Sequence, residues 1–219
     1  MKSPVVPHPM RFPLGKVRLH GDLIAPEDAQ GLVVFVHGSG SSRHSPRNRS
    51  VARFFNGLGM ATLLFDLLTE EEQLIDEVSR QLRFDIPLLS ERLSGVVDQL
   101  RANADLRDLK LGLFGASTGA AAALIAAAAR PADIAALVSR GGRVDLATDV
   151  LEKVHAPSLF IVGELDSEVL ALNRQAAGRL RCQHELAVVP GATHLFEEQG
   201  KLEEVERLAG QWFLQHLAG

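Results

Sequence analysis

An α/β fold, in which helices cover both faces of a doubly wound and mostly parallel sheet, is predicted by the sequence of this 219-residue chain. Short apolar runs of strand length alternate with longer segments of helical periodicity. Most of these runs are apolar at every position, which is typical of strands buried on both faces. Strands that alternate with helices indicate a parallel sheet. In such sheets the functional side chains gather beyond the carboxyl ends of the strands.

The first predicted strand differs from the later ones. Residues Val17–Ile24 alternate between apolar and polar side chains, as in a half-buried antiparallel strand at a sheet edge. Continuous apolar runs predict the other strands, at Leu32–Val36, Ala61–Phe65, Leu109–Phe114, Ile134–Val138, Ser158–Val162 and Glu185–Val189. Helices are expected between them, near residues 46–58, 84–103, 118–129, 168–180 and 200–217. The last helix carries an apolar stripe that predicts core packing.

One stretch, residues 69–83, shows no regular pattern and begins with three consecutive glutamates after Thr69. We interpret it as a solvated connection, and the alternative is a small excursion over the active site. We therefore expect a minimal cap, or no cap, over the active site. No long linker, repeat or low-complexity tract interrupts the chain, so we expect residues 1–219 to form a single α/β domain.

Composition argues against several classes of function. A net charge of -4 without a basic stripe argues against nucleic-acid binding. The apolar run Ala120–Ala129 is far shorter than the ~20 residues that cross a bilayer, and prolines interrupt residues 1–10 where a signal peptide needs an apolar core. Cys182 is the only cysteine, so no internal disulfide is expected. We expect a cytoplasmic protein with no nucleic-acid or membrane partner, and the oligomeric state stays open.

The most informative segment is Leu109–Gly119, in which an apolar strand leads through a tight turn into an alanine-rich helix. Ser117 lies at the turn, between Gly115 and Gly119. In this context the pattern G-x-S-x-G predicts a nucleophile elbow, where a serine hydroxyl is held clear of the packing. The pentapeptide also occurs by chance in glycine-rich loops, so further residues must support the assignment.

Two more side chains follow later strands. Asp166 comes just after the strand Ser158–Val162, and His194 comes just after Glu185–Val189. Either could be a structural loop or cap residue when taken alone. Together with Ser117 they stand in the chain order of a Ser-Asp-His triad, in which His194 would be the base and Asp166 would orient it. Asp145 is the reserve candidate for the acid.

The loop after the strand Leu32–Val36 is rich in glycine and serine. We expect the amides of Ser39 and Thr118 to form an oxyanion hole there. A phosphate-binding loop is rejected because the Gly-Lys-Ser/Thr ending and the dinucleotide glycine spacing are both missing. His37 is expected to shape the loop and His44 to lie at or near the surface. No group of side chains has zinc-site spacing, so neither a metal nor a cofactor is expected.

These motifs resemble those of the α/β-hydrolases, in particular the dienelactone hydrolase-like group, over nearly the whole chain. The motifs that carry the resemblance are His37–Asn48, Phe65–Thr69, Arg83–Pro87, Gly115–Gly119, Ser139–Gly142, Gly163–Asp166 and Gly191–His194. The resemblance implies an α/β-hydrolase fold and hydrolysis through an acyl-enzyme. Dienelactone hydrolases of that group carry a cysteine nucleophile, whereas this chain has Ser117, which favours a general carboxylic ester hydrolase.

We therefore predict a hydrolase that cleaves small carboxylic esters through Ser117. A lactone, thioester or other acyl hydrolase would share the triad, and a non-catalytic binding protein with the same fold is the alternative of another class. Substrate carboxylates could be bound by arginines on two predicted active-site loops, namely Arg43, Arg47, Arg140 and Arg143. The competing interpretation is that these arginines pair with acids such as Asp145 or Asp66 and hold the loops in place.

Overall fold

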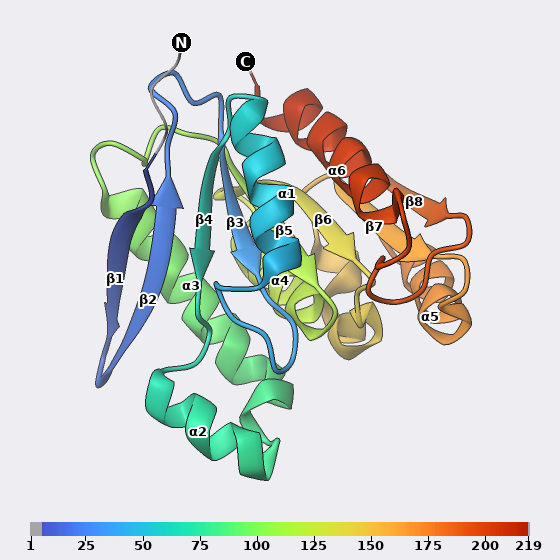
Figure 1. Cartoon of the computed structure of the whole chain (residues 1–219), viewed down its shortest axis with the longest axis horizontal. Coiled ribbons are helices and arrows are strands. Elements are labelled where there is room, and N and C mark those ends of the chain that lie inside the picture. Colours follow the sequence, from blue (N-terminus) through green and yellow to red (C-terminus); the bar gives the residue numbers. More distant parts are fainter. Residues whose placement is uncertain (1–5, 219) are drawn as a thin grey trace.

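Within residues 6–218 the chain forms one eight-stranded sheet with helices on both faces (Figure 1). The computed structural model describes residues 6–218. Its strands are β1 (His8–Leu14), β2 (Val17–Ile24), β3 (Leu32–Val36), β4 (Ala61–Phe65), β5 (Leu111–Ala116), β6 (Ile134–Arg140), β7 (Ser158–Gly163) and β8 (His184–Val189). They lie in the order β1-β2-β4-β3-β5-β6-β7-β8. The ladders from β4 to β8 are parallel, so the predicted fold class is confirmed.

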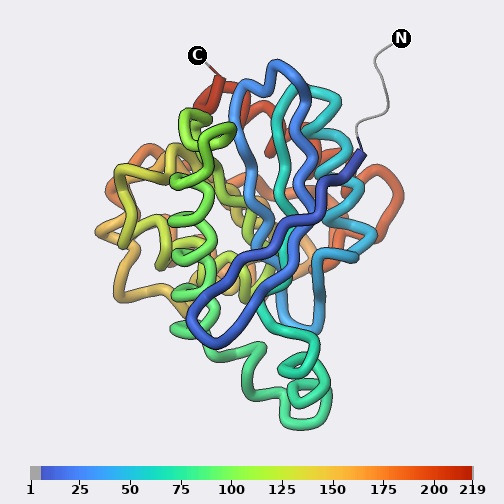
Figure 2. The backbone as a smooth tube through the Cα atoms, turned by 90° about the vertical axis from the view of Figure 1, so that its left-hand side faces the viewer, coloured from blue at the N-terminus to red at the C-terminus, as the bar shows by residue number. Residues whose placement is uncertain are grey.

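The antiparallel end of the sheet differs from the prediction in one respect. β2 is antiparallel and half-buried, as expected, but it is not the edge strand, because β1 pairs with it from Val17 to Leu23. The hairpin of β1 and β2 faces the viewer in Figure 2. The sequence of β1 contains Pro9 and Pro13, which cannot donate to a ladder and are tolerated in strands at sheet edges. Because of these prolines, β1 was not predicted from the sequence.

Helices pack against both faces of the sheet. The helices are α1 (Pro46–Gly57), α2 (Glu70–Ser79), α3 (Ile86–Ala102), α4 (Thr118–Ala129), α5 (Ser167–Ala177) and α6 (Lys201–Leu217). α1 and α6 bury the core that contains Phe35, Phe55 and Phe114, whereas α3 and α4 bury the core on the opposite face. None of the helices within residues 6–218 is long and apolar enough to span a membrane.

The expectation that residues 69–83 have no regular structure is wrong, although most of their side chains are exposed or only partly buried. These residues form α2, followed by a short 3₁₀ helix at Leu82–Phe84, and α2 extends beyond the carboxyl end of the parallel strands (Figures 1 and 2). Thr69 and Glu72 form a capping box at its start. Glu72 also accepts two hydrogen bonds from the buried Arg92 of α3, each 2.5 Å long. An ordered helix therefore lies beside the loop edge where the predicted site falls.

Candidate active site

Ser117 occupies a strained turn between β5 and α4. β5 ends at Ala116 and α4 begins at Thr118, and Ser117 between them has φ 50° and ψ -121°. A non-glycine residue in this region is strained and persists only where its surroundings impose it. A methyl group on Gly119 would lie 2.1 Å from the Val36 carbonyl oxygen, and one on Gly115 would lie 2.5 Å from Ala120 Cα. Only glycine fits at both positions, as a nucleophile elbow requires.

Asp166 and His194 are brought together from the ends of two neighbouring strands. Asp166 follows β7 and His194 follows β8, and His194 Nδ1 donates to Asp166 Oδ2 over 2.6 Å. Asp166 is the N-cap residue of α5, yet its side chain makes no capping hydrogen bond. With Nδ1 as the donor, His194 Nε2 remains available as an acceptor. Asp145, the reserve candidate, is bound instead to Arg143 by two hydrogen bonds of 2.9 and 2.8 Å.

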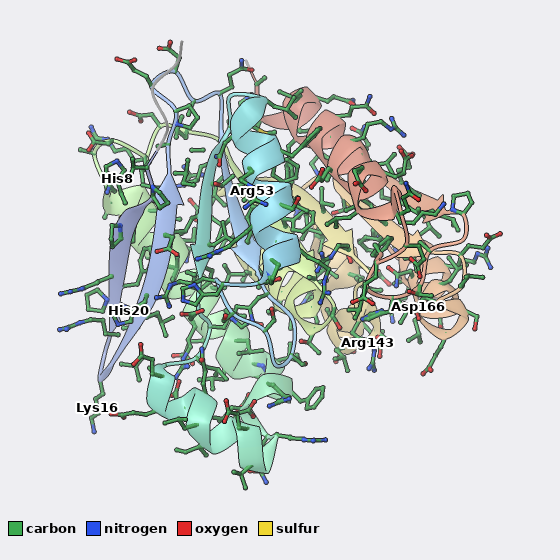
Figure 3. All side chains as sticks on the ribbon, in the orientation of Figure 1. His8, Lys16, His20, Arg53, Arg143 and Asp166 are labelled. Carbon is green, nitrogen blue, oxygen red and sulfur yellow. The ribbon has the colours of Figure 1, made fainter. Side chains whose placement is uncertain are left out.

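The turn after β6 links Ser117 to His194. The Ser117 amide donates to the Arg140 carbonyl at 3.1 Å, and the Arg143 amide donates to the Ser117 carbonyl at 3.0 Å. Gly141, which lies between these two contacts, is so close to the histidine that an added methyl group would lie 3.3 Å from His194 Cε1. Asp166 and Arg143 lie at this same edge of the molecule in Figure 3. The turn thus contacts the backbone of Ser117 and lies against the ring of His194.

The loop after β3 lies against the other side of Ser117. A methyl group on Gly38 would be 3.1 Å from Ser117 Cβ, and the hydroxyls of Ser39 and Thr118 are hydrogen-bonded at 2.9 Å. Among residues 6–218, neither the Ser39 amide nor the Thr118 amide has a hydrogen-bond acceptor. Two unpaired amides next to a strained serine form a place where negative charge can be stabilised.

His37 holds this loop in position. Its Nδ1 donates to the Gly38 carbonyl and its Nε2 accepts from the Leu67 amide, both at 3.0 Å. Burial lowers the pKa of His37, so the ring is neutral and can act as donor and acceptor at once. The expected loop-shaping role fits these contacts. His44 is exposed and accepts a hydrogen bond from Arg49, which fits its expected surface position.

A cavity of about 260 Å³ opens between the β3 loop and α2. The loop lines it from Gly38 to Ser42, and Gln73, Asp76 and Arg83 line it from the segment around α2. Ser39 Oγ also donates to the Arg83 carbonyl at 3.4 Å. The sequence interpretation preferred an irregular connection here and kept an excursion over the active site only as the alternative, so it missed the helix that lines this cavity. The Thr69-x-x-Glu72 capping pattern was the signal that could have revealed the helix.

The dienelactone hydrolase from Anabaena variabilis, known from a crystal structure, is 51% identical to this chain with a TM-score of 0.96, and the match covers 97% of this chain and 99% of that one. The chain belongs to the dienelactone hydrolase-like group of the α/β-hydrolases. Est1E from Butyrivibrio proteoclasticus shares the α/β-hydrolase fold at 18% identity, with a TM-score of 0.79 over 94% of this chain and 98% of its own. No protein-family model matches the chain.

Two curated proteins of Mycobacterium tuberculosis strains are also similar to this dienelactone hydrolase-like chain. They carry the provisional name phosphoribosyl transferase and are 55% identical over 205 residues, which is 94% of this chain. The match covers 45% of each of them, so the chain spans less than half the length of these relatives. Their name was therefore given to proteins much longer than this chain.

The four arginines that the sequence singled out have different surroundings in this hydrolase fold. Arg43 is paired with Asp66 and lies 3.5 Å from Asp22, and Arg143 is paired with Asp145. These two arginines hold loops in place, as the competing interpretation stated. Arg47 has an exposed partner, Glu197, at 3.2 Å. Arg140 is the last residue of β6 and not a loop residue, and its side chain is buried.

Proposed function

We propose that this chain hydrolyses small carboxylic esters through an acyl-enzyme formed on Ser117. In this mechanism Ser117 Oγ attacks the ester carbonyl while His194 accepts its proton, and His194 then returns the proton to the leaving alcohol. Water repeats the sequence to release the acid. The observation that carries the proposal is the 2.6 Å contact between His194 and Asp166 at the edge where the strained Ser117 lies. Asp166 orients the ring and stabilises the imidazolium.

The oxyanion of the tetrahedral intermediate would be bound by the amides of Ser39 and Thr118. Both amides lack an acceptor within residues 6–218, and the hydrogen bond between the two side-chain hydroxyls fixes the residues that carry them. Preorganised donors of this kind contribute about 3–4 kcal/mol each to lowering the barrier. The Thr118 amide lies at the start of α4, where the helix dipole adds to the effect.

Lactone, thioester and other acyl substrates compete with simple esters as the natural substrate. The name of the Anabaena relative makes a lactone the first alternative to a simple ester, since that protein is 51% identical over nearly the whole chain. A non-catalytic binding protein would have no need for a strained serine beside an oriented histidine, which argues against the alternative of another class. A phosphoribosyl transferase activity has no support from particular residues of this chain.

Replacing Ser117 by alanine tests the proposal directly. We expect Ser117→Ala to abolish labelling by a fluorophosphonate probe and to reduce the hydrolysis of para-nitrophenyl butyrate by several orders of magnitude, on the order of 10³-fold or more. Ser94→Ala on α3 removes a hydroxyl far from the elbow and serves as the matched control. Retention of more than about a tenth of the activity in Ser117→Ala would remove Ser117 from the mechanism. A panel of short esters, lactones and thioesters then ranks the substrate classes.

A further inference from the structure

Asp76 is a buried carboxylate that the proposed mechanism does not use. It lies in the last turn of α2, and only 3% of the residue is exposed. Its Oδ1 atom accepts a hydrogen bond from the Arg83 amide at 3.1 Å, and its Oδ2 atom accepts from Arg83 Nε at 2.6 Å. Arg83 Nη2 also donates to the Asp76 carbonyl at 3.0 Å. Asp76 therefore fixes Arg83 at both its main chain and its side chain.

Both members of this pair are charged at neutral pH. Burial by itself raises the pKa of Asp76, but the hydrogen bonds from Arg83 outweigh this effect and hold that pKa below its usual value. Only 20% of the Arg83 side chain is exposed. Removing either partner would leave the other charge buried alone, so the pair strongly constrains the geometry of the groups it joins.

Arg83 contacts the loop after β3 in two ways. Its carbonyl accepts a hydrogen bond from Ser39 Oγ at 3.4 Å. Its Nη1 atom lies against Gly40, so closely that a methyl group on Gly40 would lie 3.2 Å from it. Gly40 also has a φ of 67°, a conformation that glycine adopts without strain. The end of the α2 segment is thus packed onto the loop that carries the Ser39 amide.

A chain of hydroxyl groups continues this contact to the nucleophile elbow. Ser39 Oγ and Thr118 Oγ1 are hydrogen-bonded at 2.9 Å. A hydroxyl has one proton, and Ser39 gives its proton to the Arg83 carbonyl, so Thr118 is the donor to Ser39. Thr118 is buried and directly follows Ser117. Contacts therefore run from Asp76 through Arg83 to both residues whose amides are the proposed oxyanion donors.

We propose that Arg83, held by Asp76, is a positioning residue for the oxyanion hole and fixes the direction of the Ser39 amide. The inference rests on the proposed function, because it concerns the donors of that same site. Such donors act only when they are fixed before the reaction, and a misplacement of about 1 Å can cost on the order of 100-fold in rate. Acylation and deacylation use the same donors, so loss of the pair should slow both steps and change KM little.

Matched arginine substitutions test this role. We expect Arg83→Met to lower kcat for para-nitrophenyl butyrate on the order of 10-fold to 100-fold, with KM within about 3-fold of the wild type. Asp76→Asn should give the same pattern. Arg80→Met removes an exposed arginine at the end of α2, changes the net charge equally and should keep both constants. An equal loss in Arg80→Met, or a loss that falls on KM, would overturn the assignment.

An analogue of the tetrahedral intermediate tests the oxyanion hole itself. Butylboronic acid binds a serine nucleophile as a tetrahedral adduct, with one boronate oxygen in the place of the oxyanion. Its inhibition constant should rise in Arg83→Met by about the factor by which kcat/KM falls, and it should not change in Arg80→Met. An unchanged inhibition constant in Arg83→Met would overturn the assignment, because the donors would then still be in place.

The outcomes separate this inference from the proposed function. Failure of the fluorophosphonate probe to label Ser117 would contradict the proposed function. Labelling of the wild type together with an unchanged kcat in Arg83→Met and Asp76→Asn would overturn only the positioning role.

A double variant tests whether Arg83 and Asp76 act as a unit. Because both substitutions break the same pair, the double variant should lose no more kcat than about the larger single loss. Losses that multiply would contradict the proposal that Asp76 acts through Arg83. Melting curves show whether each variant folds. Asp76→Asn keeps the volume of the side chain, so it carries the kinetic test if Arg83→Met does not fold.

Discussion

At the scale of single residues, the site depends on which acid holds His194. Two aspartates follow neighbouring strands, and the sequence left both open as candidates. Asp166 contacts His194 and makes no capping hydrogen bond, whereas Asp145 is occupied by Arg143. The distinction is geometric: both carboxylates lie near the same edge, but only one faces the imidazole.

This difference gives a paired prediction. Asp166→Asn should reduce kcat by about three to four orders of magnitude, because an amide at this position favours the wrong histidine tautomer without changing the volume of the side chain. Asp145→Asn makes the same chemical change next to Arg143 and should cost less than about 10-fold. Steady-state kinetics on para-nitrophenyl butyrate measure the loss of kcat in both variants, and circular dichroism checks that they fold. Comparable losses in the two variants would contradict the assignment of Asp166.

At the scale of elements, α2 is held by local interactions and lies outside both cores. Its capping box and the contacts of Glu72 with Arg92 fix its start, and Asp76 binds Arg83 at its end at 2.6 Å. Its apolar residues Leu74, Ile75 and Val78 are exposed, so little apolar burial supports it. We therefore expect α2 to open locally at a lower free-energy cost than the helices that cover the sheet.

Removing the cap should increase this opening. Thr69→Ala should cost α2 about 1 kcal/mol, because the hydroxyl that accepts from the Glu72 amide is lost. Amide hydrogen exchange within residues 70–79 should then become about 5-fold faster while exchange in β3 and β5 stays unchanged. Thr69→Ser keeps the capping oxygen and is the control. Faster exchange across the sheet as well, or the same acceleration in Thr69→Ser, would show that α2 is not an independent unit.

The residues that were predictable from sequence are those whose role depends on local pattern. The strands from β3 to β7 are continuous apolar runs, and the elbow at Ser117 has its glycines within two positions. β1 and α2 escaped detection because prolines and a glutamate run dominated their composition. The contact of Arg83 with the loop after β3 could not be predicted at all. It depends on where two segments far apart in the sequence come to lie, and no local pattern encodes that.

At the scale of the whole molecule, two cores share one sheet. Phe114 of β5 packs into the core under α1 and α6, and Leu113, its neighbour in the same strand, packs into the core under α3 and α4. Trp212 of α6 is tied to the chain before β7 by a 3.3 Å hydrogen bond from its indole N–H to the Pro157 carbonyl. Neither pair of helices can separate from the sheet without exposing strands that also form the core on the opposite face.

We therefore expect a single unfolding transition. Its measurement tests the prediction that residues 1–219 form one domain. Melting curves from far-ultraviolet circular dichroism and from Trp212 fluorescence should coincide. Phe213→Ala empties a site that is fully buried and packs against Gly112 and Phe55, at a cost of about 3–5 kcal/mol. The midpoints of both curves should therefore fall together by about 6–20 °C, whereas Gln215→Ala on the exposed side of α6 should leave them within about 2 °C of the wild type. A fluorescence transition that precedes the loss of circular dichroism would show that α6 separates from the sheet before the rest unfolds.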